Sequence, residues 1–386
     1  MRVALVHMRH AAIGGTELIL DRLSKRLAER GHGVTIVCRS HIEASHPSIR
    51  FVILRSRVIG SAWRMFAFAV AVERHVRESN YDLVVGLGKT WTHDVVRTGG
   101  GSHATFIERM RGVDPGSWRN AEWLRAWKDR LALRIERKAF APGAFLRVIA
   151  NSTLVRDDIC ERYGVKRDLV DIVYNGVDLE RFHPRLKTQS SALRTELGAH
   201  PGDLVFLFLG KGFARKGLDR LLTAFAQLAL KQPTAKLWIA GRDSTSPHYE
   251  ALARSLNISG RVRFLGQRRD PEHCLAVADV HVLPTHYDSF AFSVLESLAV
   301  GTPVITTDAA GAAELLSPGI DGEVLPGTCE ADELAAALER WCDRDRIIAA
   351  AAPARATAEK YGFEITMDQL ALVLERVEAE KRARRA

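Results

Sequence analysis

Residues 288–307, which read Asp-Ser-Phe-Ala-Phe-Ser-Val-Leu-Glu-Ser-Leu-Ala-Val-Gly-Thr-Pro-Val-Ile-Thr-Thr, decide how the second half of the chain folds. They follow a short apolar run at residues 280–284, which predicts a buried strand. An acidic loop, a helix closed by Gly301 and a second apolar run complete a βαβ unit. In open α/β folds the loop after such a strand lies at the carboxyl edge of the sheet, where ligands bind. We therefore expect Asp288 and Glu296 near a ligand, although their spacing alone carries little weight.

Two series of strand-like and helix-like segments surround this unit and predict an α/β chain. Apolar runs typical of strands lie at residues 2–7, 34–38, 51–54, 83–87, 146–150 and 171–174 in the first series, and at 204–209, 237–240, 262–265, 280–283 and 304–306 in the second. Segments with helical periodicity lie at residues 16–30, 62–78, 217–230, 271–278, 331–344 and 346–360. We predict two doubly wound Rossmann-like domains that face each other across a cleft, with a ligand bound at the seam.

The boundary between the domains is predicted from residues 182–191, which lack periodicity and are rich in polar and turn-forming residues. We expect the first Rossmann-like domain at residues 1–183, a linker at 184–200 and the second Rossmann-like domain at 201–362. The last segment, residues 363–386, is expected to form a helix that packs back towards the first domain.

Composition is that of an ordinary globular protein, with 386 residues of which 47% are hydrophobic and 26% charged. The five cysteines are scattered and form no C-x-x-C pair, which argues against a disulfide framework or a zinc site and for a reducing compartment. The longest apolar run, residues 65–72, is too short to span a membrane. The N-terminus becomes polar too soon for a signal peptide. We therefore expect a cytoplasmic protein.

Basic residues gather in the first half of the chain. Residues 1–185 contain 31 Lys and Arg against 20 Asp and Glu, whereas residues 186–386 contain 24 against 26. Such asymmetry indicates a polyanionic partner or an anionic membrane surface, with a solvated cationic surface as the alternative. Because no nucleic-acid-binding module can be recognised, nucleic acid is not expected as a partner.

The segment 118–138 predicts a basic amphipathic helix. Its apolar residues at helical spacing are Leu124, Trp127, Leu131 and Ile135, and its basic residues are Arg125, Lys128, Arg130, Arg134, Arg137 and Lys138. This pattern is typical of a helix that lies on an anionic leaflet, and it predicts peripheral contact with the cytoplasmic face of the inner membrane. A helix packed on the core with a cationic outer face has the same pattern.

The turn after the first strand of the second domain, residues 210–217, is the strongest phosphate-binding candidate. It reads Gly-Lys-Gly-Phe-Ala-Arg-Lys-Gly and opens a helix. Two adjacent cations at a helix start oppose the helix dipole, which suggests that they hold an anion. Arg215 can grip phosphate oxygens with two nitrogens and Lys216 can add a point charge, which suits a diphosphate leaving group.

In the opening motif, Glu296 lies one turn into its helix, where it can accept hydrogen bonds from paired ribose hydroxyls. Asp288 is expected nearer the reacting sugar. The main-chain N–H groups around Ser289 and Phe290 belong to a helix start, where such donors lack partners within the helix.

The first domain offers weaker candidates. Gly14 and Gly15 lie between a strand and a helix, where free N–H groups favour a phosphate, although a plain tight turn has the same sequence. His103 follows a run of three glycines that would bring its side chain close to a ligand, and His93 with Asp94 is the alternative pair. The glycines at 86–90 lack the spacing of a nucleotide-binding loop.

Four stretches of the chain resemble the retaining GT-B glycosyltransferases of family 4. They are the Gly14-Gly15 turn, residues 174–182, residues 212–220 and residues 288–307, and the similarity extends over nearly the whole chain. The motifs of the second domain are the more specific. One departure is that the first glutamate of the family motif is Asp288 here, which has a shorter side chain.

The resemblance implies transfer of a hexose, with retained anomeric configuration, from a nucleotide diphosphate sugar such as a UDP-sugar to a lipopolysaccharide-core or other envelope-glycan acceptor. It implies a donor on the second domain, with Arg215 and Lys216 on the diphosphate and Glu296 on the ribose, an acceptor on the first domain, and no metal or other cofactor. The residues expected to bind the donor are Gly15, Arg215, Lys216, Ser289, Phe290 and Glu296, and the expected catalytic residues are His103 and Asp288. The sequence has no Asp-x-Asp motif at the end of a predicted strand, so it predicts no metal site. Cationic side chains and backbone N–H groups would then stabilise the negative charge of the leaving group.

Two alternatives stay open at this point. A nucleotide-sugar epimerase can share the two-domain architecture, and a protein that binds sugar nucleotides without catalysis would also carry these motifs. A dehydrogenase is disfavoured because neither domain has a dinucleotide-binding fingerprint.

Overall fold

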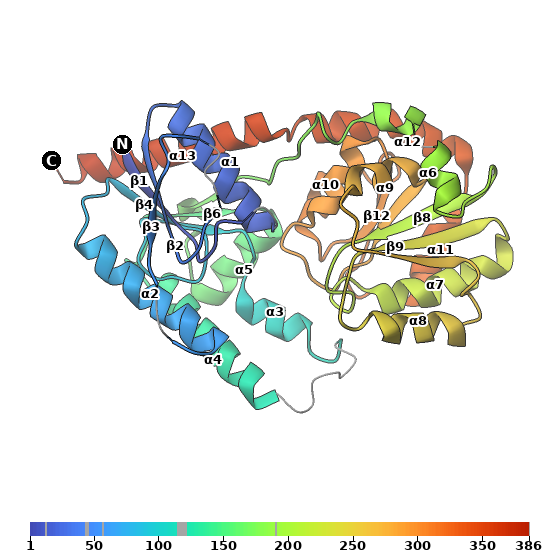
Figure 1. Cartoon of the computed structure of the whole chain (residues 1–386), viewed down its shortest axis with the longest axis horizontal. Coiled ribbons are helices and arrows are strands. Elements are labelled where there is room, and N and C mark those ends of the chain that lie inside the picture. Colours follow the sequence, from blue (N-terminus) through green and yellow to red (C-terminus); the bar gives the residue numbers. More distant parts are fainter. Residues whose placement is uncertain (12–13, 43–45, 56–57, 114–121, 190, 386) are drawn as a thin grey trace. The chain divides into compact units, whose positions relative to one another are not determined.

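The computed structural model of the chain describes residues 1–11, 14–42, 46–55, 58–113, 122–189 and 191–385. The chain divides into two compact units. Unit 1 comprises Met1–Glu108, Trp118–Asn175 and Phe363–Ala386, and unit 2 comprises Arg109–Ser117 and Gly176–Gly362 (Figure 1). Each unit is built on its own parallel sheet, which confirms the predicted α/β class with two doubly wound Rossmann-like folds.

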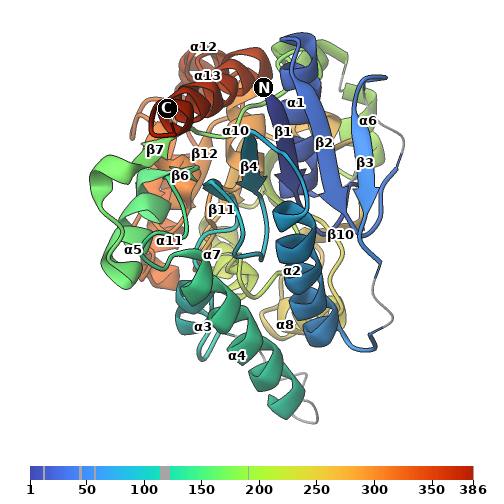
Figure 2. The ribbon, with the colours of Figure 1, turned by 90° about the vertical axis from the view of Figure 1, so that its left-hand side faces the viewer.

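Unit 1 contains a sheet of seven parallel strands in the order β3-β2-β1-β4-β5-β6-β7. The strands are β1 (Arg2–Val6), β2 (Gly33–Cys38), β3 (Arg50–Ile53), β4 (Leu83–Gly86), β5 (Val95–Thr98), β6 (Arg147–Ala150) and β7 (Val170–Ile172). Figure 2 shows β1, β2 and β3 side by side. The central strands are buried on both faces, which explains why they read as apolar runs. The strand β5 is absent from the predicted strands, because Arg97 interrupts its apolar run.

Helices cover both faces of the unit 1 sheet. They are α1 (Gly15–Glu29), α2 (Ser61–Arg77), α3 (His103–Arg109), α4 (Glu122–Ala139), α5 (Thr153–Tyr163) and α13 (Phe363–Ala383), with a short 3-10 helix η2 (Arg167–Leu169). The helix α5 begins at Ser152, whose hydroxyl accepts a hydrogen bond from the Val155 N–H, and it ends at Gly164 in the left-handed conformation. One part of the core joins Val6 of β1 and Val84 of β4 to Phe68 and Val72 of α2.

Unit 2 contains a sheet of six parallel strands in the order β10-β9-β8-β11-β12-β13. The strands are β8 (Leu204–Leu209), β9 (Ala235–Ala240), β10 (Val262–Gly266), β11 (Val280–Leu283), β12 (Val304–Thr307) and β13 (Gly322–Leu325). The βαβ unit predicted from residues 280–307 is present as β11, α10 (Phe292–Ala299) and β12. Thr306 and Thr307 of β12 donate their hydroxyls to the carbonyls of Leu283 and Thr285, which fixes β12 beside β11.

The other helices of unit 2 are α6 (Ser191–Glu196), α7 (Leu218–Lys231), α8 (Ser246–Ser255), α9 (Pro271–Val277), α11 (Ala331–Arg340) and α12 (Arg344–Glu359), with 3-10 helices η3 (Pro184–Gln189) and η4 (Gly311–Leu315). The stretch 184–200 therefore includes η3 and α6. Arg194 of α6 forms an ion pair with Asp279 at 2.8 Å and donates to the Val277 carbonyl, so this stretch is fastened to the end of α9.

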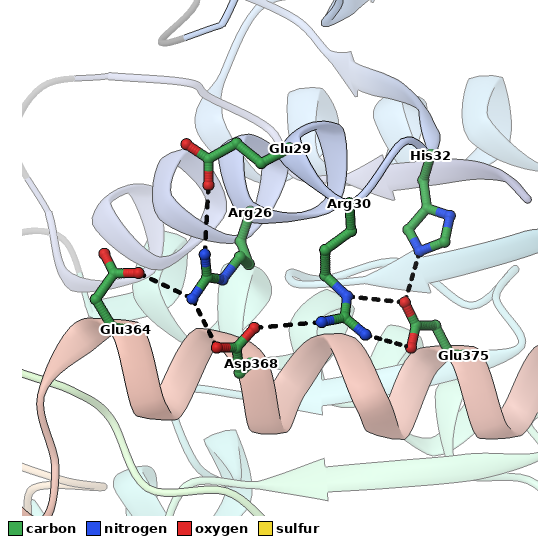
Figure 3. A network of polar contacts seen from close by, with 7 residues as sticks. All are labelled: Arg26, Glu29, Arg30, His32, Glu364, Asp368 and Glu375. Carbon is green, nitrogen blue, oxygen red and sulfur yellow. Dashed lines mark hydrogen bonds and ion pairs between the residues drawn. The ribbon is translucent and has the colours of Figure 1, made fainter.

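Two helices of unit 1 that are distant in sequence, α1 and α13, lie side by side and are joined by a network of charged side chains (Figure 3). Arg26 of α1 and Arg30, which directly follows this helix, reach Asp368 of α13 at 2.6 Å and 3.5 Å. Arg30 also donates two hydrogen bonds to Glu375, and His32 contacts the same carboxylate at 2.7 Å. Arg30 and His32 hold the pKa of Glu375 down, to about 2.

This network predicts that Glu375→Gln loosens α13. The ionised form of Glu375 is favoured in the folded state, so its contribution is present above the ordinary pKa of a glutamate and is lost as pH falls towards 2. Because the groups are partly exposed, we expect a loss of roughly 0.5–1 kcal/mol near neutral pH. Hydrogen exchange of α13 amides measures it. Glu378→Gln, on the same helix, is the matched control and should leave exchange unchanged; equal exchange in both variants would contradict the prediction.

Candidate active site

The predicted donor residues of unit 2 lie in two loops that flank the point where the strand order reverses, except for Glu296, which lies on the helix α10 that follows the second loop. The chain leaves β8 towards β9 on one side and returns as β11 on the other, so the loops 210–217 and 284–291 open at the carboxyl edge of adjacent strands. In doubly wound sheets this is the place where ligands bind. The loops contact each other, because the N–H of His286 and the hydroxyl of Thr285 both donate to the carbonyl of Arg215, at 2.9 Å and 3.0 Å.

Glycines allow these loops to approach so closely. Gly217 has φ of +71°, and an added β-carbon there would lie 2.0 Å from the carbonyl oxygen of Pro284. Gly212 also has positive φ, +73°, which L side chains rarely adopt. Asp243 accepts a hydrogen bond from the Phe213 N–H at 3.0 Å, which fixes the turn from the neighbouring strand's loop. The glycine turn is therefore held from two sides.

Asp288, Arg215 and Lys216 form one charged cluster. The Asp288 carboxylate lies 2.8 Å from Nη1 of Arg215 and 3.4 Å from Nζ of Lys216, and the side chains of Lys216 and Asp288 are only 9% and 14% exposed. Burial disfavours the charged form of Asp288, but Lys216 and Arg215 outweigh it and hold the pKa well below the ordinary value. The structure thus brings together the predicted cations and the first acid of the motif.

The other carboxylate oxygen of Asp288 contacts the start of α10. Its Oδ1 accepts hydrogen bonds from the N–H groups of Phe290 and Ala291, at 3.2 Å and 2.8 Å. The donors predicted around Phe290 are therefore taken by Asp288 in this structure, and the Phe290 ring is buried in the core. Ala291 has φ of +67°, a strained conformation for a residue with a β-carbon, and such strain tends to collect at functional sites.

Glu296, the second acid of the motif, differs from Asp288. Its side chain is half-buried on α10, and no hydrogen bond or ion pair of its carboxylate is found among the described residues. Burial raises the pKa of Glu296 to about 7, against the opposing charges of Arg181 and Lys216. A carboxylate of this kind can accept hydrogen bonds from a ligand at neutral pH.

Two arginines that were not predicted as site residues support this site. Arg181 is held by Glu272 at 2.8 Å, and its charge acts on Glu296. Arg220 of α7 donates to Nδ1 of His286 at 2.8 Å and to the carbonyl of Gly327, so it positions the loop that carries Asp288. Both lie within the stretches 174–182 and 212–220 that the family resemblance rests on, which was the available signal.

Gly15, the donor residue predicted in the other domain, is the first residue of α1 in unit 1. The turn before it is closed by Glu17, because an added β-carbon at Gly14 would lie 2.2 Å from Oε2 of that side chain. Glu17 pairs with Arg9 at 3.3 Å and with His7 at 3.9 Å. The nearby His7 and Arg9 lower the pKa of Glu17, although burial opposes them. The Gly14 side of this helix start is thus occupied by a resident carboxylate.

His103 is the first residue of α3 and is held from α4. Its main-chain N–H donates to the Glu136 carboxylate, and its Nε2 lies 2.9 Å from Oδ1 of Asp129. Burial lowers the pKa of His103, Lys89 adds to this effect and Asp129 opposes it. With Nε2–H donating to Asp129, Nδ1 is the acceptor nitrogen of a neutral ring. The alternative His93 is buried and lies 3.3 Å from the carbonyl of Ala139, so it serves the core.

Of the two predictions for the basic segment 118–138, the described part of α4 agrees with the helix packed on the core. Leu131 and Ile135 are 8% and 1% exposed and pack on Met65 and Ala69 of α2. Among the side chains of the stripe that the structure describes, only Trp127 is exposed, at 41%. The side chains of Leu124 and Arg125, and residues 118–121, lie outside the part of the chain that the structure describes. The period of 3.6 residues reflected packing on the core.

Neither a metal-binding cluster nor a membrane-spanning helix is found in the described part of the chain. No group of three His, Cys, Asp or Glu side chains there could hold a metal ion. No helix among the described residues is both long and apolar enough to cross a bilayer.

Comparison with protein families gives matches to both halves of the chain. The family of glycosyl transferases group 1 matches residues 189–362, and Glycosyltransferase Family 4 matches residues 13–181. Among curated proteins, D-inositol 3-phosphate glycosyltransferase of Rhodococcus jostii is 31% identical over 234 residues, which cover 58% of this chain and 51% of that protein. The chain spans about half the length of the first curated relatives that it matches.

Other relatives are similar over nearly their whole length. Lipopolysaccharide glucosyltransferase WaaG of Escherichia coli is 23% identical over 343 residues, which cover 88% of this chain and 89% of WaaG. The crystal structure of WaaG superposes with a TM-score of 0.81 at 22% identity, over 96% of this chain and 99% of that one. Anabaena HepE in complex with UDP-glucose superposes with a TM-score of 0.71 at 20% identity, over 97% and 100%. These structures share the fold.

Proposed function

Because the chain belongs to the GT-B glycosyltransferases, with a family 4 domain followed by a group 1 domain, we propose that it transfers a hexose from a nucleotide diphosphate sugar to a glycan acceptor. The observation that carries this proposal is the cluster of Arg215, Lys216 and Asp288 in the paired loops of unit 2. The donor binds there through its diphosphate. A UDP-hexose is favoured, a choice supported by the UDP-glucose complex of the HepE structure.

Arg215 is arranged to receive a phosphate. One nitrogen, Nη1, serves both the Tyr287 carbonyl and Asp288, and among the described residues no hydrogen bond uses Nη2 or Nε of Arg215. A guanidinium with a free edge can grip two phosphate oxygens. Lys216 adds positive charge, so negative charge that develops on the leaving diphosphate is met by fixed cations rather than by a metal.

Asp288 keeps these cations in place, with Ser289 and the start of α10 beside the donor. His103 supplies a neutral imidazole nitrogen for a hydroxyl of the reacting sugars, and Gly15 lets a ligand approach the turn that begins α1. The acceptor is a glycan bound by unit 1; a lipopolysaccharide-core or other envelope glycan is suggested by the similarity to WaaG. Transfer retains the anomeric configuration, in keeping with the resemblance to retaining enzymes.

The proposal is tested by incubating the protein with a panel of nucleotide sugars, with and without lipopolysaccharide-core acceptors, in the presence of EDTA. We expect an α-linked product from an α-linked donor, detected by NMR of the anomeric proton. Conversion of the donor alone into an epimer, with no transfer, would overturn the proposal. Binding of donors without any turnover would also overturn it.

Glu296 is proposed to hold the ribose hydroxyls of the donor. Because its pKa is raised to about 7, the carboxylate is ionised above that pH and protonated below it. The ionised form accepts the stronger hydrogen bonds, so donor affinity should fall as pH drops through 7. In Glu296→Gln we expect affinity to be lower by roughly 10- to 100-fold at pH 8 and to show little dependence on pH, the loss expected for hydrogen bonds to a charged group.

Calorimetric titration with UDP-glucose between pH 6 and 8.5 measures both effects. Glu323→Gln, which removes a carboxylate elsewhere in unit 2, is the control and should bind the donor as the wild type does. A wild-type pH profile for Glu296→Gln would show that another group binds the ribose.

Peripheral contact with an anionic membrane is proposed for the surface of α4 and α2. Trp127 of α4 and Trp63 of α2 are exposed, at 41% and 48%, and their rings lie 5.9 Å apart. The basic residues of α4 that are exposed around them are Lys128, Arg130, Arg134, Arg137 and Lys138. Exposed aromatic side chains beside cations are typical of proteins that dock on anionic leaflets.

We expect the protein to cosediment with vesicles rich in phosphatidylglycerol at low salt and to be released by high salt, because counterions screen the attraction. Trp63→Ala combined with Trp127→Ala should reduce the bound fraction several-fold. Replacing the exposed Ile348 of unit 2 is the control. If the wild type stays in the supernatant at low salt, this surface does not dock on membranes.

A further inference from the structure

Arg97, in the middle of β5, is a buried cation that has no counter-ion among the residues that the structure describes. Its side chain is 4% exposed. Within the described ranges its guanidinium makes a single hydrogen bond, from Nη2 to Oδ1 of Asn175, and the buried Nε has no partner. No carboxylate among the described residues lies within ion-pair distance of it. The acid in the first turn of α1, Glu17, is paired with Arg9 and His7 instead.

The other arginines that are largely buried show what Arg97 lacks. Arg215 has Asp288 at 2.8 Å, and Arg194 has Asp279 at 2.8 Å. Arg355 donates to three carbonyls and pairs with Glu359. A buried charge with neither a partner ion nor a full set of hydrogen bonds is destabilising. Burial lowers the pKa of Arg97 to about 10, so the group is still charged at neutral pH.

Polar groups and a stretch of glycine backbone surround Arg97. An added β-carbon at Gly99 would lie 2.5 Å from Nη1 of Arg97 and 3.7 Å from Oγ1 of Thr16, so these two side chains converge on Gly99. A β-carbon at Gly100 would meet nothing within 4 Å, so this backbone borders free space. Asn151 donates to the Gly99 carbonyl, and its buried Oδ1 has no partner among the described residues.

We propose that Arg97, together with Thr16 and the glycine backbone at residues 99–101, binds a phosphate group of a ligand at a site in unit 1 that is separate from Arg215 and Lys216. The planar guanidinium offers two parallel N–H donors to phosphate oxygens, and Thr16 adds a hydroxyl. The bound anion supplies the charge that Arg97 lacks in the free protein. The identity of the ligand rests on the proposed function: the phosphate belongs either to the donor or to a phosphorylated acceptor sugar.

Thermal unfolding with inorganic phosphate tests the site. A residue kept for binding is destabilising when empty, so Arg97→Met should unfold at the same temperature as the wild type or higher. Phosphate should still raise the Tm of Arg215→Ala, because the site at Arg97 is intact in that variant. This remaining rise in Tm should be absent from Arg97→Met. Arg147→Met is the matched control on the neighbouring strand β6; since Arg147 pairs with Glu380, that variant should unfold at a lower temperature and keep the response to phosphate. Arg97→Lys keeps the positive charge but not the paired N–H donors of the guanidinium, so phosphate should raise its Tm by less than that of the wild type.

Calorimetric titrations separate the two sources of phosphate. If the donor is the source, Arg97→Met weakens UDP-glucose at least tenfold and leaves glucose 6-phosphate unchanged; if the acceptor is the source, the reverse holds. The site is disproved if Arg97→Met unfolds early, as Arg147→Met does, and both Arg97→Met and Arg97→Lys respond to phosphate as the wild type does. The proposed donor site fails separately, if Arg215→Ala binds UDP-glucose with wild-type affinity.

Discussion

Arg215→Ala is expected to lower the turnover of glycosyl transfer by roughly 10²- to 10³-fold, the usual scale for removing one preorganised donor to developing charge. The guanidinium is fixed before any ligand arrives, because Nη1 is bonded to both Asp288 and the Tyr287 carbonyl. Its free edge is therefore aimed without a reorganisation step. Initial rates at saturating nucleotide sugar measure the loss, and they separate it from weaker donor binding.

Two further variants sharpen this experiment. Arg215→Lys keeps the charge but loses the paired N–H donors, so it should recover only part of the rate. Arg268→Ala removes an arginine of unit 2 that pairs with Asp270, and it should transfer at the wild-type rate. Wild-type turnover in Arg215→Ala would refute the assignment of this residue to the leaving diphosphate.

The fold could be predicted from sequence where successive residues of a strand are buried. The central strands of both sheets, such as β1 and β8, are buried over almost their full length and read as unbroken apolar runs. The strand β5 could not be found in this way, because Arg97 occupies a buried position that apolar residues normally fill. The residue that broke the pattern is the same one that has no counter-ion in the described part of the chain.

The sequence could predict which residues belong to the candidate site, but it could not predict their contacts. The motif at residues 288–296 and the turn at 210–217 predicted that Asp288 and Arg215 belong to one site. The sequence could not show that Asp288 also holds two N–H groups of the following turn, since that depends on the left-handed backbone of Ala291. Likewise, the partner of His103 is Asp129, 26 positions away on another helix.

The periodicity of α4 illustrates a limit of such patterns. Apolar residues at helical spacing predict a buried face, but they do not distinguish a protein core from a lipid surface. Leu131 and Ile135 turned out to face α2. Whether a single aromatic residue such as Trp63 or Trp127 is exposed depends on how α2 and α4 pack against each other. No local sequence pattern records this packing.

The shorter acid in the motif has a physical consequence. From Asp288 the carboxylate reaches Arg215, Lys216 and the N–H groups of Phe290 and Ala291 at once. A side chain with one more methylene would displace the carboxylate from these N–H groups. A carboxylate bonds best to the N–H groups of the turn that follows it when its side chain is short. We therefore interpret Asp288 as the residue that organises the cations, which leaves the ligand contacts to Arg215, Lys216 and Glu296.

Asp288→Ala should consequently destabilise unit 2 by about 3–5 kcal/mol, the range found when one partner of a buried ion pair is removed. The Lys216 side chain is only 9% exposed, so the variant leaves a buried ammonium group without the one ion-pair partner that it has among the described residues. Because the pKa of Asp288 is held below its ordinary value, the stabilisation is present above the pKa of an unfolded aspartate and is lost as pH falls below it.

Urea unfolding, followed through the buried Trp238 and Trp341 of unit 2, measures this loss. Asp270→Ala breaks the more exposed pair with Arg268 and should cost at most about 1 kcal/mol, which makes it the matched control. Asp288→Glu keeps the charge but misplaces it, so it should be more stable than Asp288→Ala and still lose turnover. If Asp288→Ala were no less stable than Asp270→Ala, Asp288 would have to act on the ligand itself, since the cations would then be held in place without it.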